Sequence, residues 1–417
     1  MSKKEKLPVE PYKGVRDFYP EDQALLNYII ATWRGVAERF GYVEYGASIL
    51  EPSALYKAKG VENEEIIKEQ TYTFTDRGER EVTLRPEMTP TVARMVAARR
   101  RELGYPLRWY SVPNCFRYER PQRGRLREFW QFNADIFGSR SPAADAEIIA
   151  LCHEMMKAFG ASERDFVIKL GSRAALNALC GELGLDEERQ KKFLALLDRR
   201  EKIPEREFDA ALAGFGASRS MLSGETPPPD VAGLLGQLRR LGINNVRYDP
   251  SVVRGFAYYT DIMFEVFDTH PDNNRAMFGG GRYDNLTQLF DDEPLPAVGC
   301  AMGDATIQDF LAARGLTPAY MPSTDAYMAV ASPEVLSAAG ALAAELRAQG
   351  VRVAVDFGDK KLGDQIKAAA KQRTPYLIVV GQDEIATGTF TVRNLSTGAE
   401  EQLSRTQLAS FFLSLKV

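Results

Sequence analysis

Short alternating segments constrain the fold of this 417-residue chain more than any other feature. Tyrosine, threonine, phenylalanine and valine alternate with polar residues in "TYTFTDRGEREVTLRP", "LRWYSVPNCFRYER" and "REFWQFNADIFG". Turn-like "DRGE" and "PQRG" join neighbouring segments, and such short connections are typical of antiparallel strands. The sequence therefore predicts an antiparallel β-sheet in the first half of the chain.

Helical patterns flank this sheet and then interrupt it. The segment "PEDQALLNYIIATWRGVAERFGY" has helical periodicity, with Pro20 in the first turn and Gly41 past the end. A second helix is predicted in "ADAEIIALCHEMMKAFG". Residues 172–245 are helical and charged and contain the proline-rich loop "SGETPPPD". Strand patterns return afterwards, so we expect a sheet that resumes after a helical insertion.

The pattern changes again near residue 320, where short strands and helices alternate as in a small α/β domain. A chain of this length is also too long for one ordinary core. We therefore expect residues 1–171 and 246–320 to be two parts of one domain. Residues 172–245 would be its insertion, and residues 325–417 a separate C-terminal domain.

Composition excludes several classes of protein. No apolar run approaches the ~20 residues that span a bilayer, and the polar start lacks the apolar core of a secretion signal. Four scattered cysteines without a CxxC pair argue against a zinc site and suit a reducing compartment. Only two histidines leave little scope for histidine ligation. We expect a cytoplasmic protein without membrane contact or a side-chain metal site.

A basic cluster stands out against the net charge of −4. Between Arg94 and Arg127 there are ten arginines and two acidic residues, a local balance of +8. The segment "FRYERPQRGRLREFWQF" places five of these arginines among five aromatic residues. Guanidinium groups suit phosphates and aromatic faces suit a base. This segment therefore indicates a nucleotide site, whereas Arg99, Arg100 and Arg101 indicate a solvated helix face.

Three further motifs carry unusual residues. "LRPEMTPTVAR" ends a strand with Arg85 and Glu87, where a carboxylate could bind an ammonium group. "FGGGRYDNL" matches neither the P-loop nor the dinucleotide pattern. Its glycines indicate either close approach of a ligand or a sheet-edge bulge. "VVRGFAYYTDIMFE" sets Arg254 beside two tyrosines, a combination that is expensive to bury without a purpose.

Together, in this order, these four blocks resemble the histidyl-tRNA synthetases, a family of class II aminoacyl-tRNA synthetases. The resemblance extends from "GVRDFYPED" to "TFTVRNLSTGAEE". It implies an antiparallel six-stranded sheet flanked by helices, with the insertion described above and a C-terminal α/β domain of the anticodon-binding type. The implied activity is ATP-dependent ligation of L-histidine to its tRNA through histidyl-adenylate.

The resemblance also implies residue roles for ATP. Arg117 would hold the α-phosphate, with Glu119 near the adenine. Arg125 would contact phosphate or adenine, and Phe129 would stack on the base. Arg254 and Arg117 would be catalytic, because fixed cations stabilise the charge that develops as diphosphate leaves. Mg²⁺ is expected on the β- and γ-phosphates.

For histidine, the resemblance implies a binding set made of Glu87, Thr89, Gln131, Asp135, Arg254, Tyr258, Tyr259 and Tyr283. Glu87 and Gln131 would receive the α-amino group, with help from Thr89. Neutral imidazole has one donor and one acceptor, and Asp135 with the tyrosines would use both. Such a pocket rejects apolar competitors strongly.

The family's partners are implied as well. Arg120 and Gln122 would lie near the acceptor end of histidine tRNA. Lys360, Lys361 and Lys367 would contact the RNA backbone, although an ordinary solvated helix face explains them equally well. The helix from Pro20 to Phe40 and the strand ending at Pro52 match the dimer-forming motif 1, so a homodimer is expected.

One motif departs from the family pattern. Motif 3 usually reads GxxxGxER, but this chain has "VGCAMGDATIQDFL", with Ala305 and Thr306 in place of Glu-Arg. Arg314 lies eight residues further on, or roughly 12 Å along a helix, which is too far to replace it. We hypothesise that Arg123 or Arg282 compensates on the γ-phosphate.

Two other classes of function compete with this interpretation. A regulatory paralogue of the synthetases binds histidine and acts with ATP phosphoribosyltransferase. Arg254 and a C-terminal domain of ~90 residues argue against it, whereas the altered motif 3 favours it. A generic RNA-binding protein would explain the arginines but leaves Glu87, Tyr259 and Tyr283 without a role.

Overall fold

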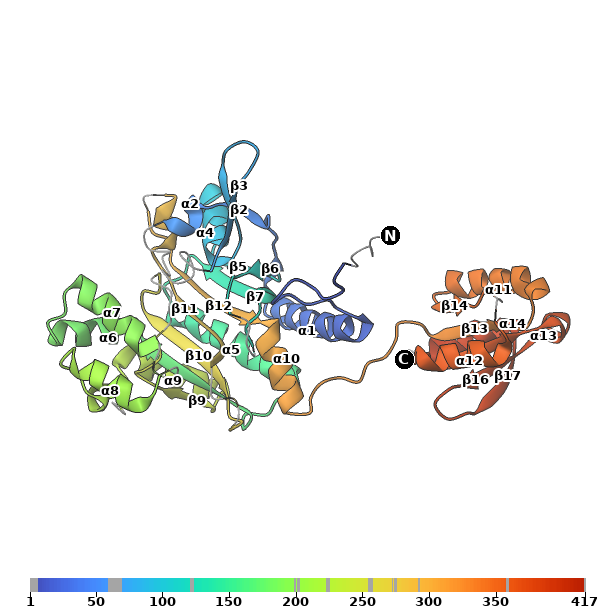
Figure 1. Ribbon diagram of the computed structural model, residues 1–417. Helices are drawn as coiled ribbons and strands as arrows, with labels where there is room; N and C mark the ends of the chain where they lie inside the picture. Colours follow the sequence, from blue (N-terminus) through green and yellow to red (C-terminus); the bar gives the residue numbers. More distant parts are fainter. Residues whose placement is uncertain are drawn as a thin grey trace. The chain divides into compact units, whose positions relative to one another are not determined.

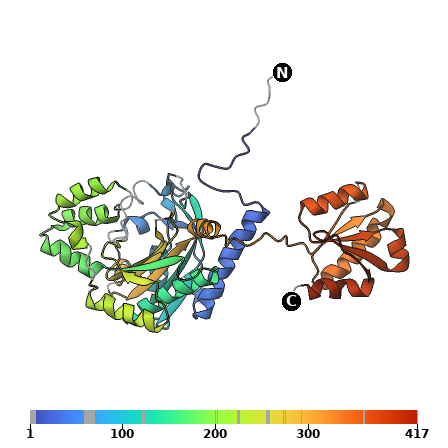
Figure 2. The same cartoon turned by 90° about the horizontal axis from the view of Figure 1, so that it is seen from below.

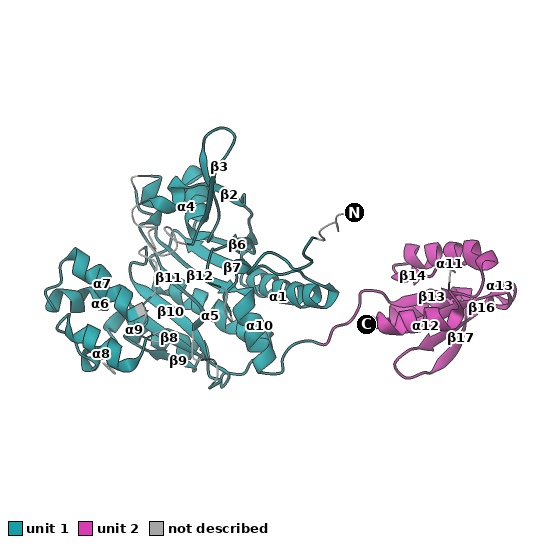
Figure 3. Ribbon diagram, in the orientation of Figure 1, with its two compact units in different colours: residues 1–318 teal, residues 319–417 magenta. Residues whose placement is uncertain are grey.

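The computed structural model describes residues 7–58, 70–120, 124–198, 200, 203–222, 226–253, 258–271, 273, 276–291, 293–357 and 360–415. The chain divides into two compact units, residues 1–318 and residues 319–417 (Figure 3). The larger unit carries the motifs of the first half of the chain, and the smaller unit is the C-terminal α/β segment.

The larger unit is built on one mixed sheet in the order β1-β5-β7-β12-β11-β10-β8-β9, with β6 paired to β7 (Figure 1). Its strands are β1 (Val43–Glu44), β5 (Leu107–Ser111), β6 (Asn114–Phe116), β7 (Glu128–Phe137), β8 (Phe166–Ser172), β9 (Val246–Tyr248), β10 (Ile262–Asp268), β11 (Ala276–Arg282) and β12 (Ala297–Gly303). The six neighbouring strands β5, β7, β12, β11, β10 and β8 pair antiparallel, which confirms the predicted six-stranded sheet. Strands β1 and β9 extend its edges in parallel.

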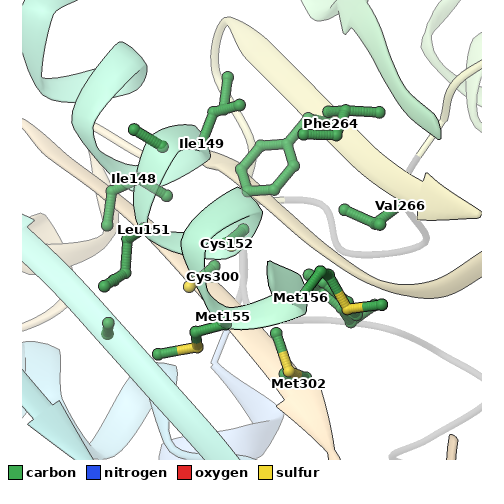
Figure 4. Close-up of a cluster of buried hydrophobic side chains, with 14 of the residues drawn as sticks. Ile148, Ile149, Leu151, Cys152, Met155, Met156, Phe264, Val266, Cys300 and Met302 are labelled. Carbon is green, nitrogen blue, oxygen red and sulfur yellow. The ribbon is translucent and has the colours of Figure 1, made fainter. Parts of the chain in front are cut away.

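One face of this sheet is covered by helices α1 (Pro20–Arg39), α5 (Pro142–Ala158), α9 (Pro229–Arg240) and α10 (Asp304–Ala313). Figure 4 shows apolar side chains of α5, such as Ile149 and Met155, in one cluster with those of β10 and β12, such as Phe264 and Met302. In β7, Phe132, Ala134 and Ile136 belong to this core. Side chains alternate along a strand, so Phe129, Gln131 and Asp135 lie on the opposite face.

The insertion contributes to two different parts of the unit. Its helices α6 (Arg173–Glu182), α7 (Glu187–Asp198) and α8 (Glu205–Ala213), with the 3₁₀ turn η1 (Arg219–Leu222), group at one side of the sheet (Figures 1 and 2). Phe193 and Phe208 are buried in this group. Helix α9 instead packs beside α5, because Val231, Leu234 and Leu238 belong to the main core.

A small sheet in the order β2-β4-β3 carries "LRPEMTPTVAR". Its strands are β2 (Leu50–Pro52), β3 (Tyr72–Thr75) and β4 (Glu81–Leu84), followed by α4 (Thr89–Ala98), with α2 (Ala54–Lys57) alongside. The predicted hairpin is confirmed, since β3 and β4 pair antiparallel around the turn after Asp76. Arg85 is buried and donates to the carbonyl oxygens of Ala47 and Asn114, so it holds loops together.

The smaller unit has a five-stranded sheet in the order β14-β13-β15-β16-β17. Its elements are β13 (Ala326–Val330), η3 (Pro333–Val335), α11 (Leu336–Ala348), β14 (Val353–Val355), α12 (Leu362–Lys371), β15 (Tyr376–Val380), α13 (Gln382–Thr387), β16 (Thr389–Asn394), β17 (Glu400–Ser404) and α14 (Arg405–Ser414). Its larger core lies between the sheet and helices α11 and α14. In neither unit do the described residues form a helix long and apolar enough to cross a bilayer.

We predict that residues 319–417 fold by themselves, because Leu342, Ile378 and Phe412 are buried within that unit alone. The isolated fragment should unfold cooperatively on heating, as followed by circular dichroism. Its Ile378→Ala variant should lose about 2–5 kcal/mol of stability, the usual cost of truncating a buried isoleucine. A broad, non-cooperative melt of the unsubstituted fragment would contradict this expectation.

Candidate functional site

A cavity of about 900 Å³ opens on the sheet face opposite α5. Among its lining residues are the predicted ATP and histidine ligands Glu87, Thr89, Arg117, Glu119, Arg125, Phe129, Gln131, Asp135, Tyr258, Tyr259 and Tyr283. They come from segments nearly two hundred residues apart, namely β7, the loops before α4 and after β6, and the segments flanking β10 and β11. The remaining predicted ligand, Arg254, lies outside the described residues.

Two guanidinium groups share one carboxylate at one side of the cavity. Arg117 donates through Nε to the Pro86 carbonyl at 2.9 Å, and its guanidinium lies 5.3 Å from the Phe129 ring centroid. Glu119 lies 3.9 Å from Arg117 and 3.5 Å from Arg125. Two cations against one anion leave a positive excess beside an aromatic face, which suits a nucleotide with its phosphates.

A second group of side chains offers acceptors. Glu87 is buried and accepts a hydrogen bond from the Tyr258 hydroxyl at 3.1 Å. Gln131 is 9% exposed, and its Oε1 has no hydrogen-bond partner among the described residues. An acceptor buried without a partner is costly, and an ammonium group supplies three donors. These two residues can therefore receive an amino group from a ligand.

Asp135 lies deeper in the same cavity and accepts a hydrogen bond from the Tyr283 hydroxyl. Burial raises the pKa of Asp135 to about 7, although the Tyr283 hydrogen bond lowers it. Burial also raises the pKa of Tyr283, so this hydroxyl stays protonated. The pair therefore presents a carboxyl group that titrates near neutral pH, next to the rings of Tyr258 and Tyr259.

Glycines make room for this pocket. A Cβ on Gly299 would lie 2.1 Å from Asp135 Oδ1, and one on Gly281 would lie 2.9 Å from the Tyr259 ring. The "GGG" segment is a regular part of β11 between β10 and β12, so a sheet-edge bulge is wrong. The space beside Gly280 and Gly281, where side chains would otherwise lie, is filled by backbone atoms and by the Tyr259 ring. These two glycines therefore leave room for a pocket side chain and not for a ligand.

The other arginines of the basic cluster differ from Arg117 and Arg125. Arg127 is buried, with its guanidinium 3.9 Å from the Tyr118 ring centroid, and it donates to Tyr12 Oη at 3.0 Å. It also donates to the backbone carbonyl of Glu119. It therefore anchors an N-terminal segment, residues 12–18, against the cavity wall. Arg120 is exposed and does not line the cavity, and Gln122 and Arg123 lie outside the described residues.

The altered motif 3 forms the first turn of α10, where Ala305 and Thr306 line the cavity. The hypothesis that Arg282 compensates is wrong. Arg282 does not line the cavity and is 4% exposed, and its guanidinium pairs with Asp145 at 2.6 Å and with Asp284 at 3.2 Å.

Two cations that line the cavity were missed from the sequence, namely Lys169 and Arg200. Lys169 pairs with Asp249 at 3.2 Å and lies 4.1 Å from the Phe267 ring centroid. The lysine inside the apolar pattern "FVIKLGS" was the available signal, because it places a charge on one face of a strand.

Comparison with solved structures identifies the class of fold. The chain superimposes on the crystal structure of histidyl-tRNA synthetase from Nostoc sp. PCC 7120 with a TM-score of 0.78 at 21% identity, over 98% of this chain and 100% of that one. The S. aureus apo histidyl-tRNA synthetase gives a TM-score of 0.73 at 23% identity, over 97% and 100%. The predicted class II synthetase fold is therefore confirmed.

Sequence comparison then identifies the family. Residues 14–223 and 229–307 match the model of the histidyl-tRNA synthetases, and residues 325–415 match an anticodon-binding domain. A histidine–tRNA ligase from Leptospira biflexa is 39% identical over 95% of both chains. One from Thermoplasma volcanium is 36% identical over 97% of this chain and 98% of its own. This chain belongs to the histidyl-tRNA synthetase family.

We predict that Asp135 makes stability depend on pH. Its folded-state pKa of about 7 exceeds its ordinary 3.8, so between these values the folded state binds a proton that the unfolded state lacks. Stability should therefore fall as pH rises from 4 to 7, by roughly 1.4 kcal/mol per unit at most. Melting temperatures of wild type and Asp135→Asn at pH 5, 6, 7 and 8 check this. Parallel curves for the two proteins would contradict it.

We also predict that Gly299→Ala disrupts the pocket around Asp135, because its Cβ would overlap Asp135 Oδ1. Histidine affinity, measured by calorimetry, should fall at least tenfold, since Asp135 must move. Gly233→Ala in α9 is the matched control, because a Cβ there meets nothing within 4 Å. Equal histidine affinity in the two variants would show that this close approach is unimportant.

Proposed function

We propose that this protein ligates L-histidine to its tRNA at the expense of ATP. Histidine and ATP would form histidyl-adenylate and diphosphate, and the histidyl group would then pass to the tRNA with release of AMP. One observation carries the proposal: a single cavity holds the Arg117–Arg125 pair with Phe129 beside the Glu87, Gln131 and Asp135 pocket.

The segment "FRYERPQRGRLREFWQF", residues 116–132, resembles the family's motif 2, in which a loop joins two strands. ATP would lie along the wall made by β7 and the described residues of this motif 2 loop, 117–120 and 124–127. Phe129 offers its ring to the adenine, and Glu119 holds the two guanidinium groups near it. Arg117 is oriented by the Pro86 carbonyl, so its fork is preorganised for the α-phosphate. Preorganised cations favour a phosphoryl transition state because they need no rearrangement as charge develops.

Histidine would bind with its amino group between Glu87 and Gln131. Thr89 lines the same cavity two residues after Glu87, so we propose it as a further contact of the amino group. The imidazole would face Asp135, with Tyr258, Tyr259 and Tyr283 around it. Tyr283 donates to Asp135, so the carboxyl oxygen left over is available for an imidazole N–H. An apolar amino acid of similar size would leave this buried carboxyl group unpaired, which is strongly disfavoured.

In the first step, the histidine carboxylate would attack the α-phosphorus and diphosphate would leave. Arg117 stabilises the charge that builds on the phosphate oxygens, and the family resemblance gives Arg254 the same task. Mg²⁺ would enter with the β- and γ-phosphates, since it prefers phosphate oxygens and water. Across the described ranges, no three acidic, histidine or cysteine side chains cluster in a way that could hold a metal ion.

In the second step, a ribose hydroxyl at the tRNA end would take the histidyl group. Arg120 and Gln122 in the motif 2 loop are our proposed acceptor-end contacts. In the C-terminal unit, Lys360, Lys361 and Lys367 are the proposed contacts near the anticodon. Lys367 pairs with Asp364 at 3.2 Å, an exposed pair that costs little to break.

We further propose a cytoplasmic homodimer. Tyr19 before α1, Val43 in β1 and Leu50 in β2 are exposed apolar side chains in the segment that resembles motif 1. A second copy of the chain would cover such side chains, which are otherwise left in water. The domain roles follow the same proposal, with residues 1–171 and 246–320 catalytic, residues 172–245 inserted and residues 325–417 binding the anticodon.

The regulatory paralogue is not favoured as an alternative. The Leptospira and Thermoplasma ligases align with nearly the whole chain, including the C-terminal unit. The altered motif 3 is compatible with a ligase if the ATP site is held in another way.

We predict that the protein charges radiolabelled histidine onto total tRNA. Arg117→Ala and Arg254→Ala should each reduce the charging rate by about 10²–10³-fold, the usual cost of removing one preorganised group from a developing charge. Arg99→Ala is the control, because Arg99 is exposed at the end of α4 and pairs with the exposed side chain of Glu102. Histidine binding without charging by wild type would favour the regulatory function.

A further inference from the structure

An ion pair between partly exposed Arg16 and buried Asp304 joins the N-terminal segment, residues 12–18, to the start of α10. Arg16 Nη2 lies 2.6 Å from Asp304 Oδ2, and Arg16 Nη1 donates to Gln308 Oε1 at 3.2 Å. Asp304 is fully buried, and its neighbours Gly303 and Ala305 both line the cavity. A buried carboxylate carries a high desolvation free energy unless a cation pairs with it. Arg16 is therefore tied to the wall of the ATP site.

The other oxygen of Asp304 connects this ion pair to the aromatic ring of the site. Asp304 Oδ1 accepts a hydrogen bond from the Trp130 backbone N–H at 2.9 Å. That N–H belongs to the peptide bond that follows Phe129, whose side chain lines the cavity. Phe18, next to Trp130 at 5.2 Å between ring centroids, adds a second link from the same N-terminal segment.

This contact lies where the family's motif 3 usually has its glutamate and arginine. The first turn of α10 has no guanidinium in this chain, because Ala305 and Thr306 occupy those positions. The motif 2 loop nevertheless packs closely on this turn, since a Cβ on Gly124 would lie 3.4 Å from Thr306 Cγ2. In this chain the guanidinium that pairs with the first turn of α10 belongs to Arg16, which lies outside the motif.

We propose that Arg16 is a positioning residue for ATP. Through Asp304 it fixes the peptide of Phe129 and the first turn of α10, so that the ring and the motif 2 loop meet the nucleotide in one geometry. The guanidinium comes from the N-terminal segment, and it acts on the wall without touching the nucleotide. This inference rests on the proposed use of ATP at this cavity.

A purely structural role is the competing explanation, and the same helix provides a matched control. Arg314, at the C-terminal end of α10, pairs with Asp268 at 2.5 Å and with Asp165 at 2.6 Å. Asp268 has a fully buried side chain, as Asp304 has. Arg314 does not line the main cavity. Loss of Arg314 should therefore destabilise the helix without changing ATP affinity.

The test measures the Kd for ATP by calorimetry, and the KM values for ATP and histidine in histidine-dependent ATP–diphosphate exchange. Arg16→Ala should raise the Kd and KM for ATP about tenfold, the order of one disturbed base stack. The KM for histidine should stay within twofold. Arg16→Lys should restore most of the ATP affinity, because it restores the cation next to Asp304.

Two further variants separate positioning from folding. Asp304→Asn replaces one of two carboxylate oxygens, which accept from Arg16 and from the Trp130 N–H, with a donor NH2 group, so its Kd for ATP should rise as in Arg16→Ala. The double variant Arg16→Met/Asp304→Leu removes both charges and should recover the melting temperature. Its Kd for ATP should remain raised, because the Trp130 N–H has lost its acceptor.

Three results would overturn the inference: an unchanged Kd for ATP in Arg16→Ala, an equal rise in Arg314→Ala, or full recovery of ATP affinity in the double variant. Failure of wild type to catalyse exchange while still binding ATP would refute the proposed ligase function instead. The Kd comparison would still decide the role of Arg16 in that case.

Discussion

The pairing register of β7, β12 and β11 is the constraint on which the pocket around Asp135 depends. It sets Asp135 opposite Gly299, and Gly299 opposite Gly281, in one row across the sheet. Because neither glycine has a Cβ, the Asp135 carboxyl group and the Tyr259 ring can lie directly on the strands. If β7 were shifted by one residue in its pairing, the Asp135 side chain would point to the opposite face of the sheet, into the apolar core under α5. The position of the Asp135 carboxyl group is therefore set by the main-chain pairing of the strands.

Buried carboxyl groups in the larger unit have two kinds of partner, arginine side chains or tyrosine hydroxyls. Asp145, Asp268 and Asp304 each face an arginine, namely Arg282, Arg314 and Arg16, and these arginines do not line the main cavity. Glu87 and Asp135 are also buried, but the groups hydrogen-bonded to them in the cavity include tyrosine hydroxyls. Neutral donors leave such carboxyl groups able to interact with a charged or polar ligand. The distinction separates arginines that hold the fold from those, such as Arg117 and Arg125, that face the cavity.

Much of this could be predicted from the sequence because it was encoded locally. Alternating patterns gave the strands, and unusual residue types in order pointed to the cavity set from Glu87 to Tyr283. The parallel pairing of β1 and β9 at the sheet edges was not predicted, because two or three residues carry no pattern that tells a parallel edge strand from an antiparallel one. The Arg16–Asp304 pair was missed because its members are 288 residues apart. Arg127 and Arg282 could not be told from ligand-binding arginines, because burial and partners decide the role of a guanidinium group and neither is visible in a sequence.

The position of the insertion has a topological consequence. The chain leaves the sheet at the end of β8 and returns through β9, which pairs with β8, before β10 pairs with the other edge of β8. The insertion of about seventy residues thus begins and ends beside the same strand. It therefore leaves the order of the other strands in the sheet unchanged. Helix α9 packs in the main core, whereas side chains of α6, α7 and α8 share the second core cluster with Tyr258, Tyr259 and Tyr283. The inserted residues therefore supply part of the cavity wall, including Leu197 and Arg200, without interrupting the sheet.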